Sequence, residues 1–204
     1  MSVYDNPFPI CAGCVEKIDF RTFIETRGLE NLESVRSCCP YENPIKKYVL
    51  QMKDRNKASI RYFFEHIITQ NLDAHPLAFE HFDAIVPIPI SRAQLLERGF
   101  NQAEILARIV REIIKQPLLA GVLIKTRHTH SQKYLNKKER MENLKRSFGI
   151  PDRSAIDGKS ILLVDDVITT GSTLEACAET LITNGATKVY GLTLAKTFRR
   201  DQIT

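Results

Sequence analysis

Hydrophobic residues follow two patterns along the chain: short apolar runs and stripes at helical spacing. The runs are residues 83–90, 122–124, 161–164 and 189–195. The stripes lie within residues 60–68, 105–113 and 174–182. The runs are typical of buried strands and the stripes of helices that pack on one face. Strands that are apolar on both faces and alternate with helices predict an α/β fold built on a parallel sheet.

Turn and cap residues indicate where several of these elements begin and end. A first helix is predicted near Asn43, with Asn43 as its cap and Pro44 in its first turn. Pro87 and Pro89 cannot donate ladder hydrogen bonds, so the strand at 83–90 must end around them. The stripe that ends before Gly185 consists of Leu174, Cys177, Ala178, Leu181 and Ile182.

The segment that follows the run at 161–164 carries the clearest chemical pattern. Asp165 and Asp166 come first, and a turn with the sequence Thr169-Thr170-Gly171-Ser172-Thr173 leads into the next helix. Free N–H groups and the dipole at a helix N-terminus favour a phosphate, and the hydroxyl groups of the turn can donate to it. The two carboxylates can accept hydrogen bonds from ribose hydroxyls or hold a hydrated Mg²⁺. The segment therefore predicts a site for a ribose 5-phosphate.

Three other interpretations of this segment are weaker. A Walker B strand would need a phosphate loop of the form G-x-x-x-x-G-K-[ST], which the sequence lacks. A phosphorelay receiver domain would need a further Asp and a Lys on later strands, and only 38 residues follow Asp166. A purely structural strand and capped helix needs one hydroxyl and explains neither the acid pair nor Gly171.

The same segment resembles the signature by which type I phosphoribosyltransferases bind phosphoribosyl pyrophosphate (PRPP). A second stretch, Pro87-Ile-Pro-Ile-Ser91-Arg92 followed by Glu97-Arg98-Gly99-Phe100-Asn101-Gln102, resembles the competence-associated ComF family, as do Arg127, Gln132, Arg140, Asn143 and Phe148. The resemblance covers residues 41–204. It implies Mg²⁺-dependent chemistry on PRPP, a pyrophosphate-binding loop after Pro89, and a basic flap that closes over the site. The residues it assigns to pyrophosphate and the flap are Ser91, Arg92, Arg98, Arg127 and Arg140.

Charge is concentrated in the region of this flap. The chain has a net charge of +5, and residues 126–146 contain seven Lys or Arg against two acids. Such a segment predicts a polyanionic partner, which can be a pyrophosphate or a nucleic-acid backbone. The flap holds a single aromatic residue, Tyr134, so stacking on nucleic-acid bases has little support.

Four of the five cysteines lie within residues 1–40, which are predicted to form a small arm before the main domain at 41–204. Cys11 and Cys14 have the spacing of half a zinc knuckle, and the ComF resemblance implies a four-cysteine zinc finger. Cys38 and Cys39 depart from that pattern because they are adjacent, and successive side chains of a strand point to opposite faces. Zinc at these four cysteines and a degenerate finger with buried thiols therefore both stay open. Cys177 is predicted to be a core residue.

The composition, with 43% hydrophobic and 26% charged residues, suits one globular domain with a small appendage. No apolar run approaches the ~20 residues that span a bilayer, and residues 1–10 do not form a secretory signal, so no membrane insertion and a cytoplasmic location are expected. Two functions follow. The first is an enzyme that transfers or hydrolytically releases the phosphoribosyl group of PRPP. The second is a DNA-uptake protein that binds single-stranded DNA or competence proteins and keeps the ribose-phosphate pocket.

Overall fold

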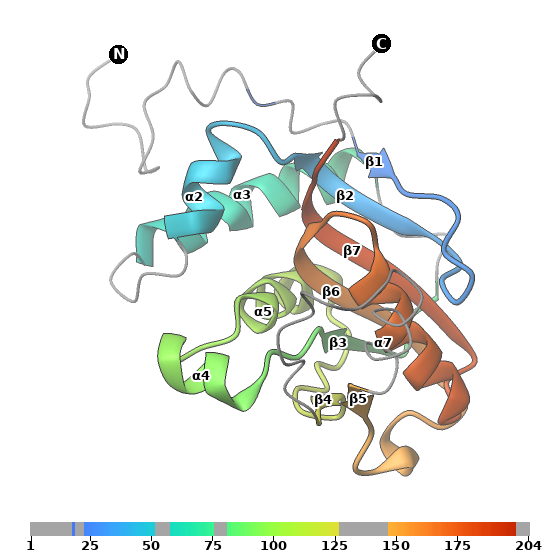
Figure 1. Cartoon of the computed structure of the whole chain (residues 1–204). Helices are drawn as coiled ribbons and strands as arrows, with labels where there is room; N and C mark the ends of the chain where they lie inside the picture. The colour runs from blue at the N-terminus through green and yellow to red at the C-terminus, as the bar shows by residue number, and fades with distance from the viewer. Residues whose placement is uncertain (1–17, 19–22, 52–57, 76–80, 127–146, 199–204) are drawn as a thin grey trace, which may run out of the picture.

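A five-stranded sheet forms the centre of the protein in a computed structural model that describes residues 18, 23–51, 58–75, 81–126 and 147–198 (Figure 1). Its strands, in spatial order, are β1 (Ile24–Glu25), β2 (Val35–Pro40), β7 (Lys188–Lys196), β6 (Ser160–Ile168) and β3 (Ala84–Pro87). β2, β7, β6 and β3 are parallel to their neighbours, and β1 pairs antiparallel with β2. The predicted α/β fold with a parallel sheet is confirmed.

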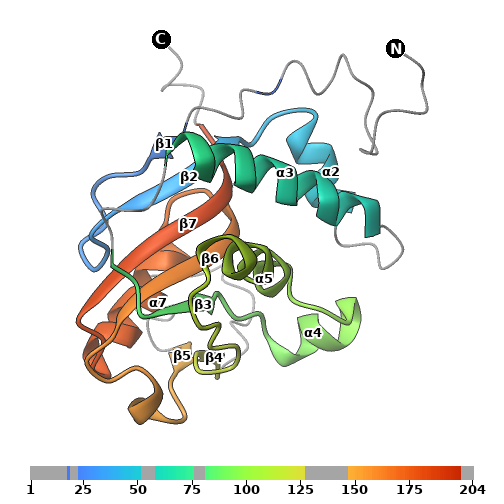
Figure 2. The same cartoon turned by 180° about the vertical axis from the view of Figure 1, so that it is seen from behind.

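Helices cover both faces of this sheet (Figures 1 and 2). On one face lie α2 (Ile45–Gln51), α3 (Ala58–Ala74) and α5 (Gln102–Ile114), and on the other lies α7 (Ser172–Thr183). β6 contributes to both layers because its side chains alternate: Leu162 belongs to the apolar cluster under α3 and α5, and Leu163 to the cluster under α7. The predicted helical stripes are confirmed at α3, where Phe63, Phe64 and Ile67 are fully buried, and at α5.

Two short helices and a small sheet complete the described structure. They are α4 (Arg92–Arg98), the 3₁₀ helix η3 (Arg153–Ala155) and the pair of β4 (Ile124–Lys125) and β5 (Phe148–Gly149). The strand predicted at 122–124 is therefore wrong as a member of the main sheet, since β4 pairs antiparallel with β5 in a separate two-stranded sheet. Leu123 instead packs with Phe148 beside α7.

The predicted stripe of α7 is narrower than expected. Leu174, Cys177, Ala178 and Leu181 are buried as predicted, whereas Ile182 is 37% exposed. Ile182 lies in the last turn of α7, which ends at Thr183, and it does not belong to the apolar cluster that contains its neighbour Leu181.

The described part of the predicted N-terminal arm is built into the main sheet. β2 pairs in parallel with β7 over residues 35–40, and β1 continues the sheet beyond β2. Residues 24–40 therefore contribute two strands to the same sheet as β6.

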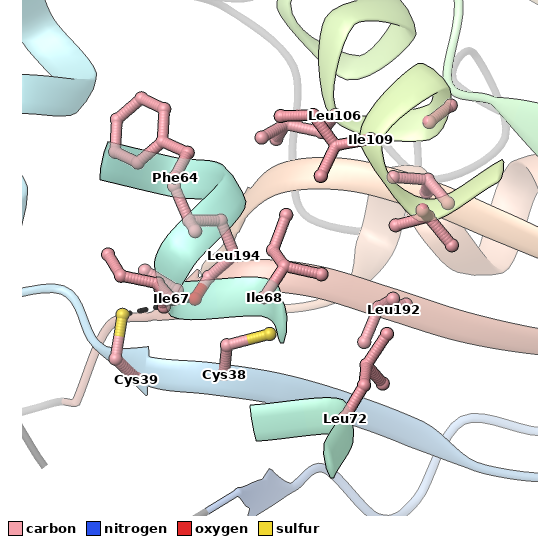
Figure 3. Packing of buried hydrophobic residues seen from close by; sticks show 14 of the residues in the cluster. Cys38, Cys39, Phe64, Ile67, Ile68, Leu72, Leu106, Ile109, Leu192 and Leu194 are labelled. Atoms are coloured by element: carbon pink, nitrogen blue, oxygen red, sulfur yellow. Dashed lines mark hydrogen bonds between the residues drawn. The ribbon is translucent and has the colours of Figure 1, made fainter. Parts of the chain in front are cut away.

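Cys38 and Cys39 lie on β2 and are both buried in the apolar cluster beneath α3, among Phe64, Ile67 and Leu194 (Figure 3). The Cys39 thiol donates a hydrogen bond of 3.2 Å to the carbonyl oxygen of Leu194. Burial raises the pKa of Cys38 to about 12, and burial together with the neighbouring Cys38 raises the pKa of Cys39 well above its ordinary value. Both cysteines are thus held as neutral thiols, whereas zinc binds thiolates.

The other two predicted zinc ligands, Cys11 and Cys14, lie outside the described residues. Within the described ranges there is no group of three or more His, Cys, Asp or Glu side chains that could hold a metal ion. Zinc at the four N-terminal cysteines stays a prediction. Across the same ranges, none of the helices combines the length and apolar character needed to traverse a lipid bilayer.

Candidate functional site

The predicted site lies at one edge of the sheet, where β2, β3, β6 and β7 all have their C-terminal ends because they run parallel. Ligands of open α/β sheets bind at this edge. β6 extends to Ile168, four residues beyond the predicted strand, so Asp165 and Asp166 lie within the strand and not after it. The chain then turns at Thr169–Gly171 and enters α7.

A pocket opens at this turn. It is lined by Asp165, by Val167 and Ile168 of β6, and by residues 169–174, and it encloses about 240 Å³ that includes its open mouth. Thr169 and Thr170 are exposed to solvent, and Gly171 and Leu174 are buried. The structure thus brings Asp165 and all five predicted phosphate-binding residues around one pocket.

The start of α7 has no side-chain cap. Gly171 is the N-cap residue, with a φ of 79°, and it has no side chain to accept hydrogen bonds from the first turn. The Ser172 amide makes a long contact of 3.4 Å with Oγ1 of Thr170. The hydroxyl oxygens of Thr170 and Ser172 lie 2.9 Å apart. Amides, hydroxyls and the helix dipole therefore converge on one small volume, which is the arrangement that anions favour.

Asp165 is the acidic group of the pocket. Burial raises the pKa of its carboxyl well above the ordinary range, and the neighbouring Asp166 raises it further, although a hydrogen bond of 2.9 Å from the Asp166 amide acts in the opposite direction. The pKa of Cys177 on α7 is raised mainly by burial, and the negative charge of Asp165 raises it further. A partly buried carboxylate of this kind is stabilised by a cation or by hydroxyl donors. Its oxygen atoms suit Mg²⁺, which prefers oxygen ligands, and the site thus fits the predicted cofactor.

Asp166 has different surroundings and is not among the residues that line the pocket. One of its carboxylate oxygens accepts a hydrogen bond of 2.7 Å from the Val167 amide. The pKa of Tyr41 is raised mainly by burial, and the negative charge of Asp166 raises it further. Tyr41 follows β2, and its amide donates to the carbonyl oxygen of Lys196 at the end of β7. The acid pair that is adjacent in sequence is therefore divided between the pocket and the neighbourhood of Tyr41.

The segment that follows β3 also lies at this edge of the sheet, because β3 runs parallel to β6. The Ile88 amide donates to the carbonyl oxygen of Val164, directly before Asp165. Ser91 caps α4 through a reciprocal pair of hydrogen bonds with Gln94, so its hydroxyl is engaged in the cap. Arg92 is exposed, and Arg98 is partly buried with a contact of 3.3 Å to Oε1 of Gln102. The pyrophosphate roles of Ser91, Arg92 and Arg98 stay predictions, and Arg127 and Arg140 lie outside the described residues.

Three residues near the site had no predicted role. Asn101 holds the segment after β3 by donating to the carbonyl oxygen of Ile88. Leu29 and Asn31 belong to the loop between β1 and β2 and contact the start of α7. Asn101 lies within the stretch that resembles ComF proteins, which could have drawn attention to it. Leu29 and Asn31 have no sequence signal, because they reach the site only through the pairing of β2 with β7.

Comparison with known proteins places this site within a recognised domain. The family model described as "Phosphoribosyl transferase domain" matches residues 64–200. Among curated proteins, competence protein F of Haemophilus influenzae is 33% identical over 115 residues, which make up 56% of this chain and 50% of that protein. The chain thus matches about half the length of that relative.

Three further similarities were found. Competence protein ComFC of Bacillus subtilis is 30% identical over 193 residues, which cover 94% of this chain and 75% of that protein. The DNA utilization protein YhgH of Escherichia coli K12 is 33% identical over 115 residues, 56% of this chain and 50% of that protein. Among solved structures, adenine phosphoribosyltransferase from Thermoanaerobacter pseudethanolicus aligns over 90% of this chain and 99% of that chain, with 14% identity and a TM-score of 0.43.

Proposed function

Because the chain belongs to the ComF family and contains a phosphoribosyltransferase domain, we propose that it binds PRPP, or another compound that carries ribose 5-phosphate, in the pocket at the end of β6. The observation that carries this proposal is the shared lining of the pocket by Asp165 and residues 169–173. The amides and hydroxyls of the turn would hold the 5-phosphate. The Asp165 carboxylate would accept hydrogen bonds from ribose hydroxyls or bind Mg²⁺.

The chemistry that suits this arrangement is substitution at the anomeric carbon of PRPP. The bond from that carbon to the pyrophosphate oxygen breaks, and the electron pair leaves with the pyrophosphate. A nucleophile, which is water in the hydrolytic case, forms the new bond and releases its proton to solvent. Bound Mg²⁺ would neutralise part of the leaving-group charge. The protein would contribute mainly by holding the ribose phosphate in place, which is why the reaction needs no dedicated general base in the pocket.

The test is release of pyrophosphate from PRPP in the presence of Mg²⁺, measured with water alone and with a panel of bases and amines. We expect wild-type protein to release pyrophosphate, and Asp165→Asn to bind PRPP more weakly and release less. Asp73→Asn is the matched control because Asp73 is an exposed acid on α3, away from the sheet edge. The proposal would be refuted if the wild type released no pyrophosphate and showed no thermal shift on addition of PRPP.

A second candidate function is a nucleic-acid-binding role in DNA uptake. It is favoured by the net positive charge of residues 126–146 and by the names of two relatives, competence protein F and DNA utilization protein YhgH. The basic segment would bind the phosphate backbone of single-stranded DNA, with an affinity that falls steeply as salt is added. This role is compatible with retention of the ribose-phosphate pocket.

A pair of double variants separates this role from general charge effects. Lys137→Gln with Lys138→Gln removes two lysines of the basic segment, and Lys46→Gln with Lys47→Gln removes two exposed lysines of α2. We expect the first pair to weaken single-stranded DNA binding and to reduce its salt dependence more than the second. Equal effects of the two pairs would argue for non-specific attraction by the net charge.

A further inference from the structure

The loop of residues 26–34, between β1 and β2, lies against the turn that forms the pocket. Its ends are held by backbone hydrogen bonds of 2.9 Å, from the Thr26 amide to the Val35 carbonyl and from the Glu33 amide to the Val189 carbonyl. Leu29 lies so close to Gly171 that a Cβ atom at Gly171 would come within 2.8 Å of Cδ2 of Leu29. The loop therefore contacts the turn through Leu29.

Asn31 makes the polar contact of this loop with α7. Its backbone amide and its side-chain Nδ2 both donate to Oε1 of Glu175, at 3.1 Å and 2.6 Å. The two residues are 144 positions apart in sequence. Glu175 is 8% exposed, and its other oxygen, Oε2, is buried without a hydrogen-bond partner among the described residues. Asn31 thus supplies two hydrogen-bond donors to a buried carboxylate in the first turn of α7.

A buried carboxylate needs donors, and the start of α7 offers others. The backbone N–H groups of the first helical turn lack partners within the helix, and the helix dipole attracts negative charge to them. The Ser172 amide lies three residues before Glu175, within the same first turn of the helix. These are the amides that the proposed phosphate would use. A Glu175 carboxylate that was not bound by Asn31 would compete with the phosphate for them.

We propose that Asn31 is a positioning residue that holds the Glu175 carboxylate away from the start of α7 and so keeps residues 169–173 ordered and open to phosphate. This proposal rests on the proposed function for its ligand. It assigns to the β1–β2 loop a role in phosphate affinity, although the loop lines no part of the pocket.

The test compares Asn31→Ala with Asn184→Ala. Asn184 is the matched control because its side chain also donates one hydrogen bond, of 2.7 Å to the Thr180 carbonyl, but at the far end of α7. Binding of ribose 5-phosphate to the full-length chain is measured by calorimetry. We expect Asn31→Ala to weaken binding by about tenfold, the effect that corresponds to losing a hydrogen bond to a charged group, and Asn184→Ala by less than about twofold.

A rescue variant separates competition by the carboxylate from simple loss of support. Asn31→Ala combined with Glu175→Gln removes the charge that would compete with phosphate, and we expect it to recover most of the lost affinity. An Asn31→Ala variant that binds as tightly as Asn184→Ala would overturn the proposal. Failure of the double variant to recover affinity would also overturn it, because the carboxylate would then not be the competitor.

Amide hydrogen exchange of the free protein keeps this inference distinct from the proposed function. We expect Asn31→Ala to change exchange across residues 169–175, and Asn184→Ala to change it only near residues 180–187. If the wild type binds no ribose 5-phosphate, the proposed function fails. A change of exchange at residues 169–175 in Asn31→Ala alone would then still support the positioning of this segment by Asn31, and unchanged exchange would refute it.

Discussion

The side-chain amide of Asn101 donates a hydrogen bond of 2.9 Å to the carbonyl oxygen of Ile88, and its Oδ1 accepts one of 3.1 Å from the Ala103 amide. One residue therefore caps α5 and holds the segment that leaves β3. The Ile88 amide in turn donates to Val164, the residue before Asp165. Asn101 thus connects the start of α5 to the strand end that carries the candidate site.

Replacing Asn101 tests these two roles separately. Asn101→Ala loses both the cap and the contact with Ile88, and we expect it to lower the free energy of unfolding by ~2 kcal/mol. Asn101→Asp keeps an oxygen that can cap α5 but loses the donor to Ile88, so a loss of ~1 kcal/mol is expected. Urea denaturation measures both. Equal losses in the two variants would show that the cap is unimportant.

Gly171→Ala should destabilise the protein for two reasons. The φ of 79° disfavours any residue with a Cβ atom, at ~1–2 kcal/mol, and the new methyl group would press on Leu29. Gly158→Ala is the matched control, because Gly158 has a φ of 69° but no atom within 4 Å of the added Cβ. Chemical denaturation should show a larger loss for Gly171→Ala than for Gly158→Ala. Addition of Leu29→Ala to each should narrow that difference, and an unchanged difference would argue against the contact.

The raised pKa of Asp165 predicts how stability changes with pH. The folded protein holds the Asp165 proton to a higher pH than the unfolded chain, whose Asp pKa is about 3.9. The contribution to stability is therefore fully present below pH ~3.9 and is lost as the pH rises through the folded pKa. Asp165→Asn has no such proton to lose. Unfolding free energies measured across this pH range should decline less steeply in Asp165→Asn than in wild type, and identical slopes would contradict the raised pKa of this carboxyl.

The thiols of Cys38, Cys39 and Cys177 should be unreactive in the folded protein. All three are buried, and their raised pKa values disfavour the nucleophilic thiolate. Of the five cysteines, at most Cys11 and Cys14 should react quickly with a disulfide reagent such as DTNB under native conditions. Addition of denaturant should expose the remaining three. Rapid reaction of three or more thiols in the native state would contradict the packing of β2 and α7.

The local pattern of the sequence predicted much of the fold correctly. The apolar run at 161–164 and the stripe behind it identified β6 and α7, because buried strands and one-sided helices each leave a periodicity that needs no knowledge of the partner. Errors arose where the prediction depended on which strand a segment pairs with. The run at 122–124 is as apolar as a core strand, yet β4 finds its partner in β5 and not in the central sheet.

The sequence by itself determined the class of the fold and the composition of the candidate phosphate turn, because Asp165 and residues 169–173 are contiguous and their spacing is set by the backbone. Tertiary structure alone decided that β2 joins the sheet, that Asp165 lines the pocket while Asp166 does not, and that Asn31 meets Glu175 across 144 positions. Contacts of this kind depend on which strands pair and which way each side chain then faces. Neither is encoded in the periodicity of a single segment.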